Sequence, residues 1–165
     1  MGQLSVLCVT VVKEVEHLTD SGSSSVRPIP QASVVPYRQL GDATEVCLIT
    51  SRRKKRWIFP KGTALERTGL IESALKAAME EAGLIGQVTG ETLGCYKRLK
   101  EGVLNEVSVF LMEVERTEAA WLDQGLRQRR WVPLDEARRL LVKPELQDMR
   151  GRAIMRIGES SSATK

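Results

Sequence analysis

Two adjacent glutamates, Glu80 and Glu81, stand near the end of a segment bounded by Gly62 and Gly83. Carboxylates of this kind are preferred oxygen ligands of hard divalent cations such as Mg²⁺, which can neutralise phosphate oxygens and activate water. Glutamate pairs are also common on solvated helix faces, so the pair alone fits either interpretation. As metal ligands, the two side chains would hold such a cation.

The segment between these glycines has the pattern of a helix over residues 69–82. Apolar residues recur at spacings of three and four and are predicted to face the core: Ile71, Ala74, Leu75, Ala78 and Ala82. Thr68 is predicted to cap the first turn through its hydroxyl, and Gly83 is predicted to end the helix. The two glutamates then lie, with Lys76 and Ala77, on the less apolar side.

Strand patterns precede and follow this helix. Segments rich in β-branched and apolar residues predict strands over residues 32–38, 45–51, 87–97, 105–115 and 129–132. Two further helices are predicted over residues 134–142, introduced by Pro133, and over residues 144–157. Residues 6–15 are rich enough in β-branched types to add an edge strand.

A chain of 165 residues is long enough for one domain with a sizeable core. Residues 32–157 are predicted to form that domain. Residues 17–31 contain serines and prolines and lack apolar surface, so residues 1–31 are expected to be a strand or arm followed by a flexible segment. Residues 158–165 are expected to be a disordered tail.

Charge and cysteine content narrow the class of protein. A formal net charge of +4 favours anionic ligands without identifying one. Cys8, Cys47 and Cys95 have neither zinc-site spacing nor an even count, and are interpreted as buried or free thiols. The apolar start has no preceding basic residue and ends at Lys13, which argues against a secretion signal or membrane span. We expect a cytoplasmic protein with no membrane partner.

Five consecutive basic residues occupy positions 52–56. Such a run could contact phosphate or nucleic acid, but a charge run in a turn between strands is more often simply solvated. No aromatic residues are interleaved with it for stacking on bases, so nucleic acid is not the expected partner.

The Nudix hydrolase signature is a glycine, five residues, a glutamate, seven residues, then Arg-Glu-apolar-any-Glu-Glu-any-Gly-apolar. The chain resembles it, without a gap in register, at Gly62, Glu80, Glu81, Gly83 and Leu84, and residues 62–84 are called the box below. Further runs at residues 57–62, 106–110 and 129–131 are similar to bacterial relatives of the diphosphoinositol polyphosphate and diadenosine polyphosphate hydrolases. The resemblance covers roughly residues 32–146 and implies a Nudix-type α/β/α sandwich with a mixed β-sheet.

Three positions depart from this signature. Thr68 replaces the first glutamate, Lys76 replaces the arginine, and Ala77 replaces the glutamate beside it. Because the three glutamates at the end of the pattern would share one helix face, Ala77 removes a member of the implied metal cluster. Lys76 can still pair with Glu72 and Glu80, four residues to either side, although without the two-pronged geometry of arginine. Loss of a metal ligand or general base predicts a rate lower by about 10²- to 10⁴-fold.

The resemblance implies divalent-metal-dependent hydrolysis of a phosphoanhydride bond in a nucleoside or inositol polyphosphate, with Mg²⁺ or Mn²⁺. Gly62, Glu80 and Glu81 are the implied metal ligands, and the two glutamates are the implied catalytic residues. A small, phosphate-rich substrate needs cations around it, and the candidates are Arg52, Arg53, Lys61, Arg98 and Lys100. Glu106, or Glu101 in the preceding turn, is a candidate compensating carboxylate. The alternative is a catalytically inactive ligand-binding or regulatory protein with the same fold.

Overall fold

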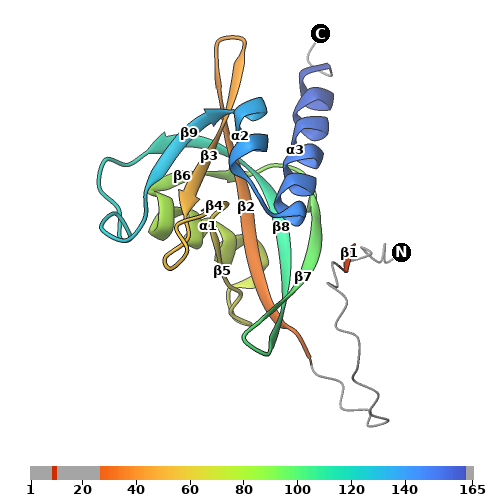
Figure 1. Cartoon of the computed structure of the whole chain (residues 1–165). Coiled ribbons are helices and arrows are strands. Elements are labelled where there is room, and N and C mark those ends of the chain that lie inside the picture. Colours follow the sequence, from red (N-terminus) through yellow and green to blue (C-terminus); the bar gives the residue numbers. More distant parts are fainter. Residues whose placement is uncertain (1–8, 11–26, 163–165) are drawn as a thin grey trace.

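The computed structural model describes residues 9–10 and 27–162, which form a mixed sheet between helices (Figure 1). The helices are α1 (Gly69–Ala82), α2 (Leu134–Leu140) and α3 (Pro144–Ser162). The strands are β1 (Val9–Thr10), β2 (Ile29–Leu40), β3 (Ala43–Thr50), β4 (Trp57–Ile58), β5 (Lys61–Thr63), β6 (Leu84–Val88), β7 (Gly94–Lys100), β8 (Val103–Thr117) and β9 (Arg129–Pro133).

The sheet has the order β1-β7-β8-β2-β3-β4, with β5 paired to β2, β6 to β8 and β9 to β3. The central strand β2 is parallel to β8 and antiparallel to β3 and β5. The sheet is therefore mixed, as predicted. The tight connection between β2 and β3 places Gly41 at a φ of 61°, in the left-handed region that glycine adopts most readily.

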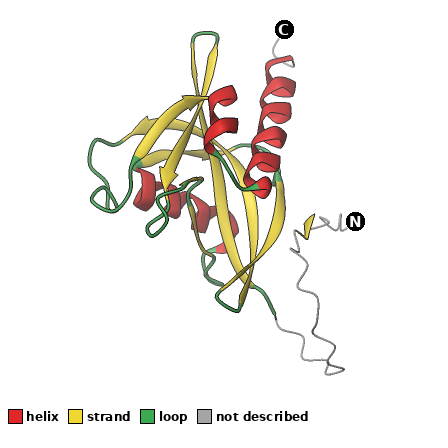
Figure 2. Ribbon diagram, viewed as in Figure 1, coloured by secondary structure: helices red, strands yellow, loops and turns green. Residues whose placement is uncertain are grey.

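Helices cover both faces of this sheet, with α1 on one side and α2 and α3 on the other (Figure 2). Alternate residues of a strand point to opposite faces. Thus Val35 packs in the core shared with α3, where Met149 is buried, and the adjacent Val34 packs in the core shared with α1, where Ala78 is buried. The predicted α/β/α sandwich is confirmed.

The single strand predicted over residues 87–97 is wrong, because two strands lie there. Strand β6 pairs with residues 112–117 of β8, and β7 pairs with residues 103–109 of the same strand. Gly90, at a φ of 72°, lies between them. Because β8 is 15 residues long, β6 and β7 each pair with a different part of it. The sequence pattern alone does not reveal this arrangement.

Helix α1 has the predicted bounds, but its buried face is rotated from the predicted one. Its buried residues are Ser73, Ala74, Ala77, Ala78 and Ala82. Ile71, which was expected in the core, is 45% exposed, and Leu75 is only partly buried. The rotation turns Ala77, which was expected on the less apolar side, towards the interior.

The ends of the chain differ from expectation where they are described. Helix α3 continues to Ser162, so residues 158–162 are helical and do not belong to a disordered tail. Strand β2 begins at Ile29, within the segment expected to be flexible, and most of that segment lies outside the described residues. Of the edge strand predicted over residues 6–15, the described part is Val9–Thr10, which pairs in parallel with β7.

Two cysteines lie within strands of the described part. Cys47 is buried and free, as expected, and burial raises its pKa to about 12. Cys95 is also buried, but it is disulfide-bonded, which corrects the expectation of a thiol there. None of the described helices is long and apolar enough to cross a membrane.

Candidate functional site

Strand β5 and helix α1 come into close contact at Gly62 and Ala77. Gly62 pairs with Ala32 of β2, and a Cβ atom built on Gly62 would lie 3.1 Å from the Cβ of Ala77. That distance is shorter than ordinary van der Waals contact, so a side chain at position 62 would push the helix from the strand. The glycine that begins the box therefore has a packing role that a larger residue cannot fill without a shift.

The other end of α1 is fixed at Gly83. This residue has a φ of 64°, and its amide donates to the carbonyl of Met79, which ends the helix as predicted. A Cβ atom there would lie 2.9 Å from both the Arg129 guanidinium and the Trp121 side chain. Arg129 itself donates through Nη1 to the Ala82 carbonyl at 2.8 Å and so satisfies a free carbonyl of the last turn.

Thr68 does not cap α1 in the predicted way. It occupies the N-cap position, but its φ of −102° and ψ of −17° are helical, and its hydroxyl makes no capping bond. The hydroxyl instead donates to the Leu65 carbonyl at 3.3 Å and lies 3.2 Å from the hydroxyl of Ser73. Ser73 donates in turn to the Gly69 carbonyl at 2.7 Å. The first turn is thus organised by the preceding loop and by Ser73.

A pocket of about 260 Å³ lies between β5 and α1. It is lined by Gly62, Thr63, Leu65, Thr68, Glu72, Ser73, Lys76, Ala77, Glu80 and Glu81. The fold therefore gathers both ends of the box around one cavity. Ala77 forms part of the wall, at the position where the signature has a glutamate.

Glu80 is the more accessible of the two box glutamates, with 38% of its side chain exposed. Its Oε1 lies 3.8 Å from Nζ of Lys76, one turn earlier, and Lys76 is 61% exposed. Exposed pairs of this spacing contribute only about 0.3–0.5 kcal/mol, so Lys76 orients Glu80 weakly. The predicted pairing of Lys76 with Glu80 is confirmed, whereas the alternative pairing with Glu72 is absent from the ion pairs of the described residues.

Glu81 is held much more firmly. Its Oε2 accepts from the backbone amide of Lys61 at 3.1 Å, and its Oε1 accepts from Nη2 of Arg127 at 3.2 Å. Burial raises the pKa of the Glu81 carboxyl above its usual value; Arg127 and the Lys61 amide oppose this rise, and Asp123 adds to it. The second box glutamate is therefore a largely enclosed, oriented acceptor.

The partner of Glu81 comes from the β8–β9 loop, which sequence reasoning missed. Arg127 also donates to Oδ2 of Asp123 at 2.9 Å and to the Thr50 carbonyl at 3.1 Å. The loop is tied to α1 by the Asp123 amide, which donates to the Glu80 carbonyl at 2.9 Å. The four-residue spacing of Asp123 and Arg127 is a visible signal in the sequence, but nothing local indicates that both are buried against a helix more than 40 residues earlier.

The cations predicted to bind substrate fall into two groups, and the first is already paired. Arg52 and Arg53 follow β3 in the turn before β4. Arg52 lies 3.5 Å from the Asp123 carboxylate, and Arg53 lies 3.2 Å from the Glu101 carboxylate. Both arginines therefore already have a carboxylate partner, and that of Arg53 is the residue that follows Lys100.

The second group, Lys61, Arg98 and Lys100, shares one face of the sheet. Tyr96 packs in the core beneath α3, and Arg98 and Lys100 follow it at alternate positions of β7. Lys61 lies directly opposite Ser33 of β2. Val35, two residues after Ser33 and therefore on the same face of β2, packs in the same core. In Figure 1 the lower ends of β2, β7 and β8 extend past the start of α3, beside β5.

Electrostatics shows that these cations are close together. Burial and, to a smaller extent, repulsion from Arg98, Lys143 and Lys100 together lower the pKa of Lys61 to about 8, while Glu81 acts in the opposite direction. A lysine surrounded by cations is destabilised in its charged form. The arrangement favours a polyanion that would neutralise the group.

Lys143, between α2 and α3, belongs to this group and was missed by sequence reasoning. Burial lowers its pKa; Arg98 adds most to that effect, Arg56 and Lys100 add less, and Glu145 opposes it. We call Lys61, Arg98, Lys100 and Lys143 the cation face. Within the described part of the chain, none of the four makes an ion pair within 4.0 Å.

No compensating carboxylate joins the two box glutamates in the described residues. Groups of three or more His, Cys, Asp or Glu side chains able to hold a metal are absent there. Glu106 lies on β8 opposite Lys97 of β7 and Pro30 of β2, and Glu101 is paired with Arg53. Neither therefore forms a three-acid cluster with Glu80 and Glu81.

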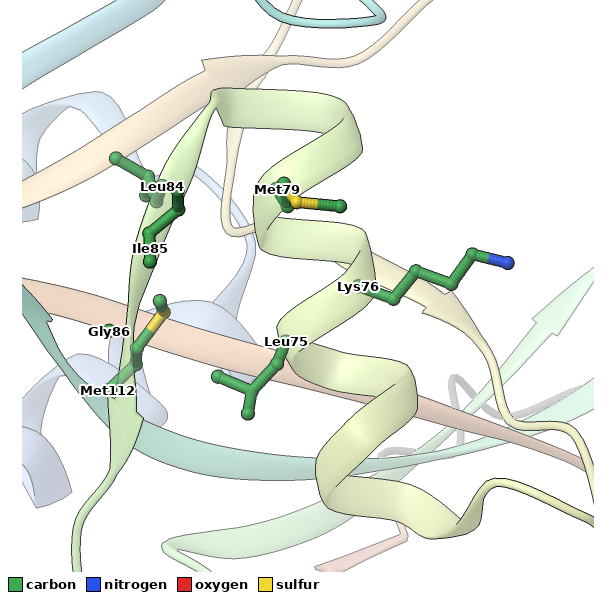
Figure 3. A pocket seen from close by; sticks show the side chains of 7 residues that line it. All are labelled: Leu75, Lys76, Met79, Leu84, Ile85, Gly86 and Met112. Carbon is green, nitrogen blue, oxygen red and sulfur yellow. The ribbon is translucent and has the colours of Figure 1, made fainter. Parts of the chain in front are cut away.

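A second pocket, of about 230 Å³, lies between α1 and β6 (Figure 3). Apart from Lys76 its lining is apolar or glycine: Leu75, Met79, Leu84, Ile85, Gly86 and Met112. Figure 3 shows the Lys76 side chain extending away from these residues. This pocket carries no acidic or nucleophilic group, so the candidate chemistry lies in the first one.

The family model of the NUDIX domain matches residues 28–153. The chain belongs to the Nudix family. This confirms the resemblance carried by Gly62, Glu80, Glu81 and Gly83.

Curated relatives carry the same family name. The chain is 35% identical over 96 residues to Nudix hydrolase 4 of Arabidopsis thaliana, covering 57% of this chain and 46% of that protein. It is 36% identical over 109 residues to the chloroplastic Nudix hydrolase 21 of the same plant, covering 62% and 54%. The match thus spans about half the length of these relatives.

Solved structures share the fold at low identity. A binary complex of a C. elegans Ap4A hydrolase superposes with a TM-score of 0.68 at 20% identity, covering 79% of this chain and 98% of that one. The NUDIX domain of Shewanella oneidensis NrtR, solved with ADP ribose, superposes with a TM-score of 0.66 at 12% identity, covering 79% and 89%. At these identities the likeness establishes the α/β/α fold.

Proposed function

We propose that this Nudix chain hydrolyses a phosphoanhydride bond in a small, phosphate-rich compound, a nucleoside or inositol polyphosphate. The observation that carries this proposal is the cation face: Lys61, Arg98 and Lys100 lie on the α3 side of the sheet and Lys143 directly precedes α3, and among the described residues none of the four makes an ion pair within 4.0 Å. Several like charges gathered without partners favour a ligand of several negative charges.

Lys61 connects this cation face to the box glutamates. Its backbone amide donates to the Glu81 carboxylate, while its side chain belongs to the cation face. Because successive residues of a strand point to opposite faces, the Lys61 side chain lies on the α3 side and Gly62 lies against α1, so a polyphosphate bound to the cation face would reach the box by passing around β5. The chain would bind and orient the substrate with the lysines and arginine, and Glu80, which opens to the pocket, would accept the proton of an attacking water.

The donor set indicates how a divalent cation would fit. Mg²⁺ in proteins commonly takes one or two carboxylates, with water and substrate phosphates completing its coordination. The Gly62 carbonyl, Glu80 and Glu81 fit an ion shared with a substrate in this way, and would hold Mg²⁺ or Mn²⁺. When bound, such an ion would neutralise phosphate charge and lower the pKa of a water. Ala77 removes the third carboxylate, so we expect slow turnover.

Ala77, in place of the glutamate of the signature, also favours a second function. Ala77 lines the pocket where the family signature has a glutamate, and Glu81 is already engaged by Arg127. A chain with an intact cation face and this pocket could bind a polyphosphate compound without cleaving it. A Nudix domain crystallised with ADP ribose provides a structural parallel for binding of a phosphate compound by this fold.

One assay separates these two functions. Product release would be measured from diadenosine polyphosphates, nucleotide sugars and diphosphoinositol polyphosphates, with Mg²⁺ or Mn²⁺ and with a chelator. Wild type would be compared with Glu81→Gln, Ala77→Glu and Glu159→Gln, the last as a control because Glu159 is exposed on α3 and does not line the pocket. Hydrolysis predicts metal-dependent turnover that Glu81→Gln abolishes and Ala77→Glu increases. Retained ligand binding with no turnover in wild type would instead support the binding protein.

A further inference from the structure

The box glutamates and their neighbours form a charge-balanced network. Glu81 pairs with Arg127, Asp123 pairs with Arg127 and Arg52, and Glu80 pairs with Lys76. Three carboxylates thus face three cationic side chains, so their formal charges sum to zero. A divalent cation is attracted to a site mainly by uncompensated negative charge, and this network offers little.

The three central residues of this network are enclosed. The side chains of Arg127, Glu81 and Asp123 are only 9%, 15% and 8% exposed. A guanidinium presents several donors in a fixed plane, and here three of them are used by Glu81, Asp123 and the Thr50 carbonyl. Arg127 is therefore held beside Glu81 by contacts within the protein.

Neighbouring contacts hold Arg127 in this place. The amide of Gln128 donates to Oγ1 of Thr50 at 2.9 Å, and the amide of Thr50 donates to the carbonyl of Gln128 at 3.0 Å. On the other side, the Asp123 amide is bonded to the Glu80 carbonyl. Moving Arg127 off Glu81 would require breaking its bond to a backbone carbonyl as well as its two ion pairs.

We propose that Arg127 acts as an internal cation that balances Glu81, so that the free chain has little affinity for divalent ions and an ion enters only together with the phosphates of its ligand. This rests on the proposed function in that it concerns the same site. It assigns to Arg127 a positioning role that Lys76, exposed and 3.8 Å from its partner, does not fill.

The test measures metal binding directly, without turnover. Mn²⁺ would be titrated into the substrate-free chain, with free ion followed by electron paramagnetic resonance, for wild type, Arg127→Gln and Arg130→Gln. Arg130 is the matched control, because it forms a 2.8 Å ion pair with Glu136 on the surface, away from the box. We expect no saturation in wild type or Arg130→Gln below about 1 mM, and binding tighter by about tenfold or more in Arg127→Gln.

Two further variants guard against misfolding. Circular dichroism would confirm that each variant is folded, and Arg127→Lys, which keeps the charge but loses the fork, should bind Mn²⁺ with intermediate strength. Ala77→Glu should gain more Mn²⁺ affinity when combined with Arg127→Gln than alone. Micromolar Mn²⁺ binding in wild type, unchanged by folded Arg127→Gln or Arg127→Lys, would overturn the proposal. A chain without hydrolytic activity can pass this test and an active one can fail it, so the two proposals are distinguishable.

Discussion

We expect Lys61 to make the affinity for the proposed polyphosphate ligand depend on pH in a range where most lysines do not titrate. Burial, followed by repulsion from Arg98, Lys143 and Lys100, lowers its pKa from 10.5 to about 8. Only the protonated amine attracts phosphate. With a pKa of about 8, roughly nine-tenths of the amines are protonated at pH 7 and roughly one-tenth at pH 9.

If binding requires the protonated form, affinity should fall about tenfold between pH 7 and pH 9, which corresponds to about 1.4 kcal/mol. The ligand should be a diadenosine polyphosphate, because every phosphate in it is bridged on both sides and does not titrate in this range. Binding would be measured by calorimetry at constant ionic strength, with a chelator present to prevent hydrolysis.

Two variants identify the titrating group. Lys61→Arg keeps a cation at all these pH values, so its affinity should stay nearly constant. Lys143→Gln removes one of the charges that lower the pKa of Lys61, so the fall should move to higher pH. Equal affinity at pH 7 and pH 9 in wild type, or the same fall in Lys61→Arg, would refute the assignment of Lys61.

Three further predictions concern stability and are checked by urea unfolding. The lowered pKa means that protonated Lys61 destabilises the fold at neutral pH, and this cost disappears as pH rises from about 8 towards 10.5. Lys61→Met should therefore raise the free energy of unfolding by on the order of 1–3 kcal/mol at pH 7 and by less at pH 10. Gly62→Ala should lower the free energy of unfolding by about 1–3 kcal/mol, because its Cβ would meet Ala77 at 3.1 Å. Gly125→Ala is the matched control, because a Cβ at Gly125 would meet nothing within 4 Å. Equal losses of stability at both glycines would contradict the packing role of Gly62. Arg129→Met should cost about 1–3 kcal/mol because two backbone carbonyls lose a 2.8 Å donor, and an unchanged midpoint would show that water replaces it.

Several features of the site could be predicted from the sequence because they depend on local geometry. The bounds of α1 follow from its periodic apolar residues and from Gly83, whose left-handed backbone ends the helix. The i, i+4 pairing of Lys76 with Glu80 follows from helix geometry alone. The hydrogen-bond partner of Thr68 could not be predicted from the sequence, because its hydroxyl had several possible acceptors and the loop supplied the Leu65 carbonyl.

Which of the candidate cations have carboxylate partners could not be predicted from the sequence, since charge alone does not say which cations are paired. Arg52 and Arg53 are cationic side chains like Lys61, yet the fold brings carboxylates to both arginines. Lys143 carries no motif, and it joins the cation face only because α3 begins beside β7. A residue's neighbours across a sheet depend on strand register, which is set by the whole core.

The sequence by itself determined the family, the box register and the loss of a carboxylate at Ala77, because fixed spacing along one helix specifies which side chains share a face. The tertiary structure alone decided that Glu81 is bound by Arg127, 46 residues further along the chain, and that Lys61 is crowded by cations from β7 and the α2–α3 connection. These contacts join segments distant in sequence, and their distances follow from how the sheet and helices pack rather than from any local pattern.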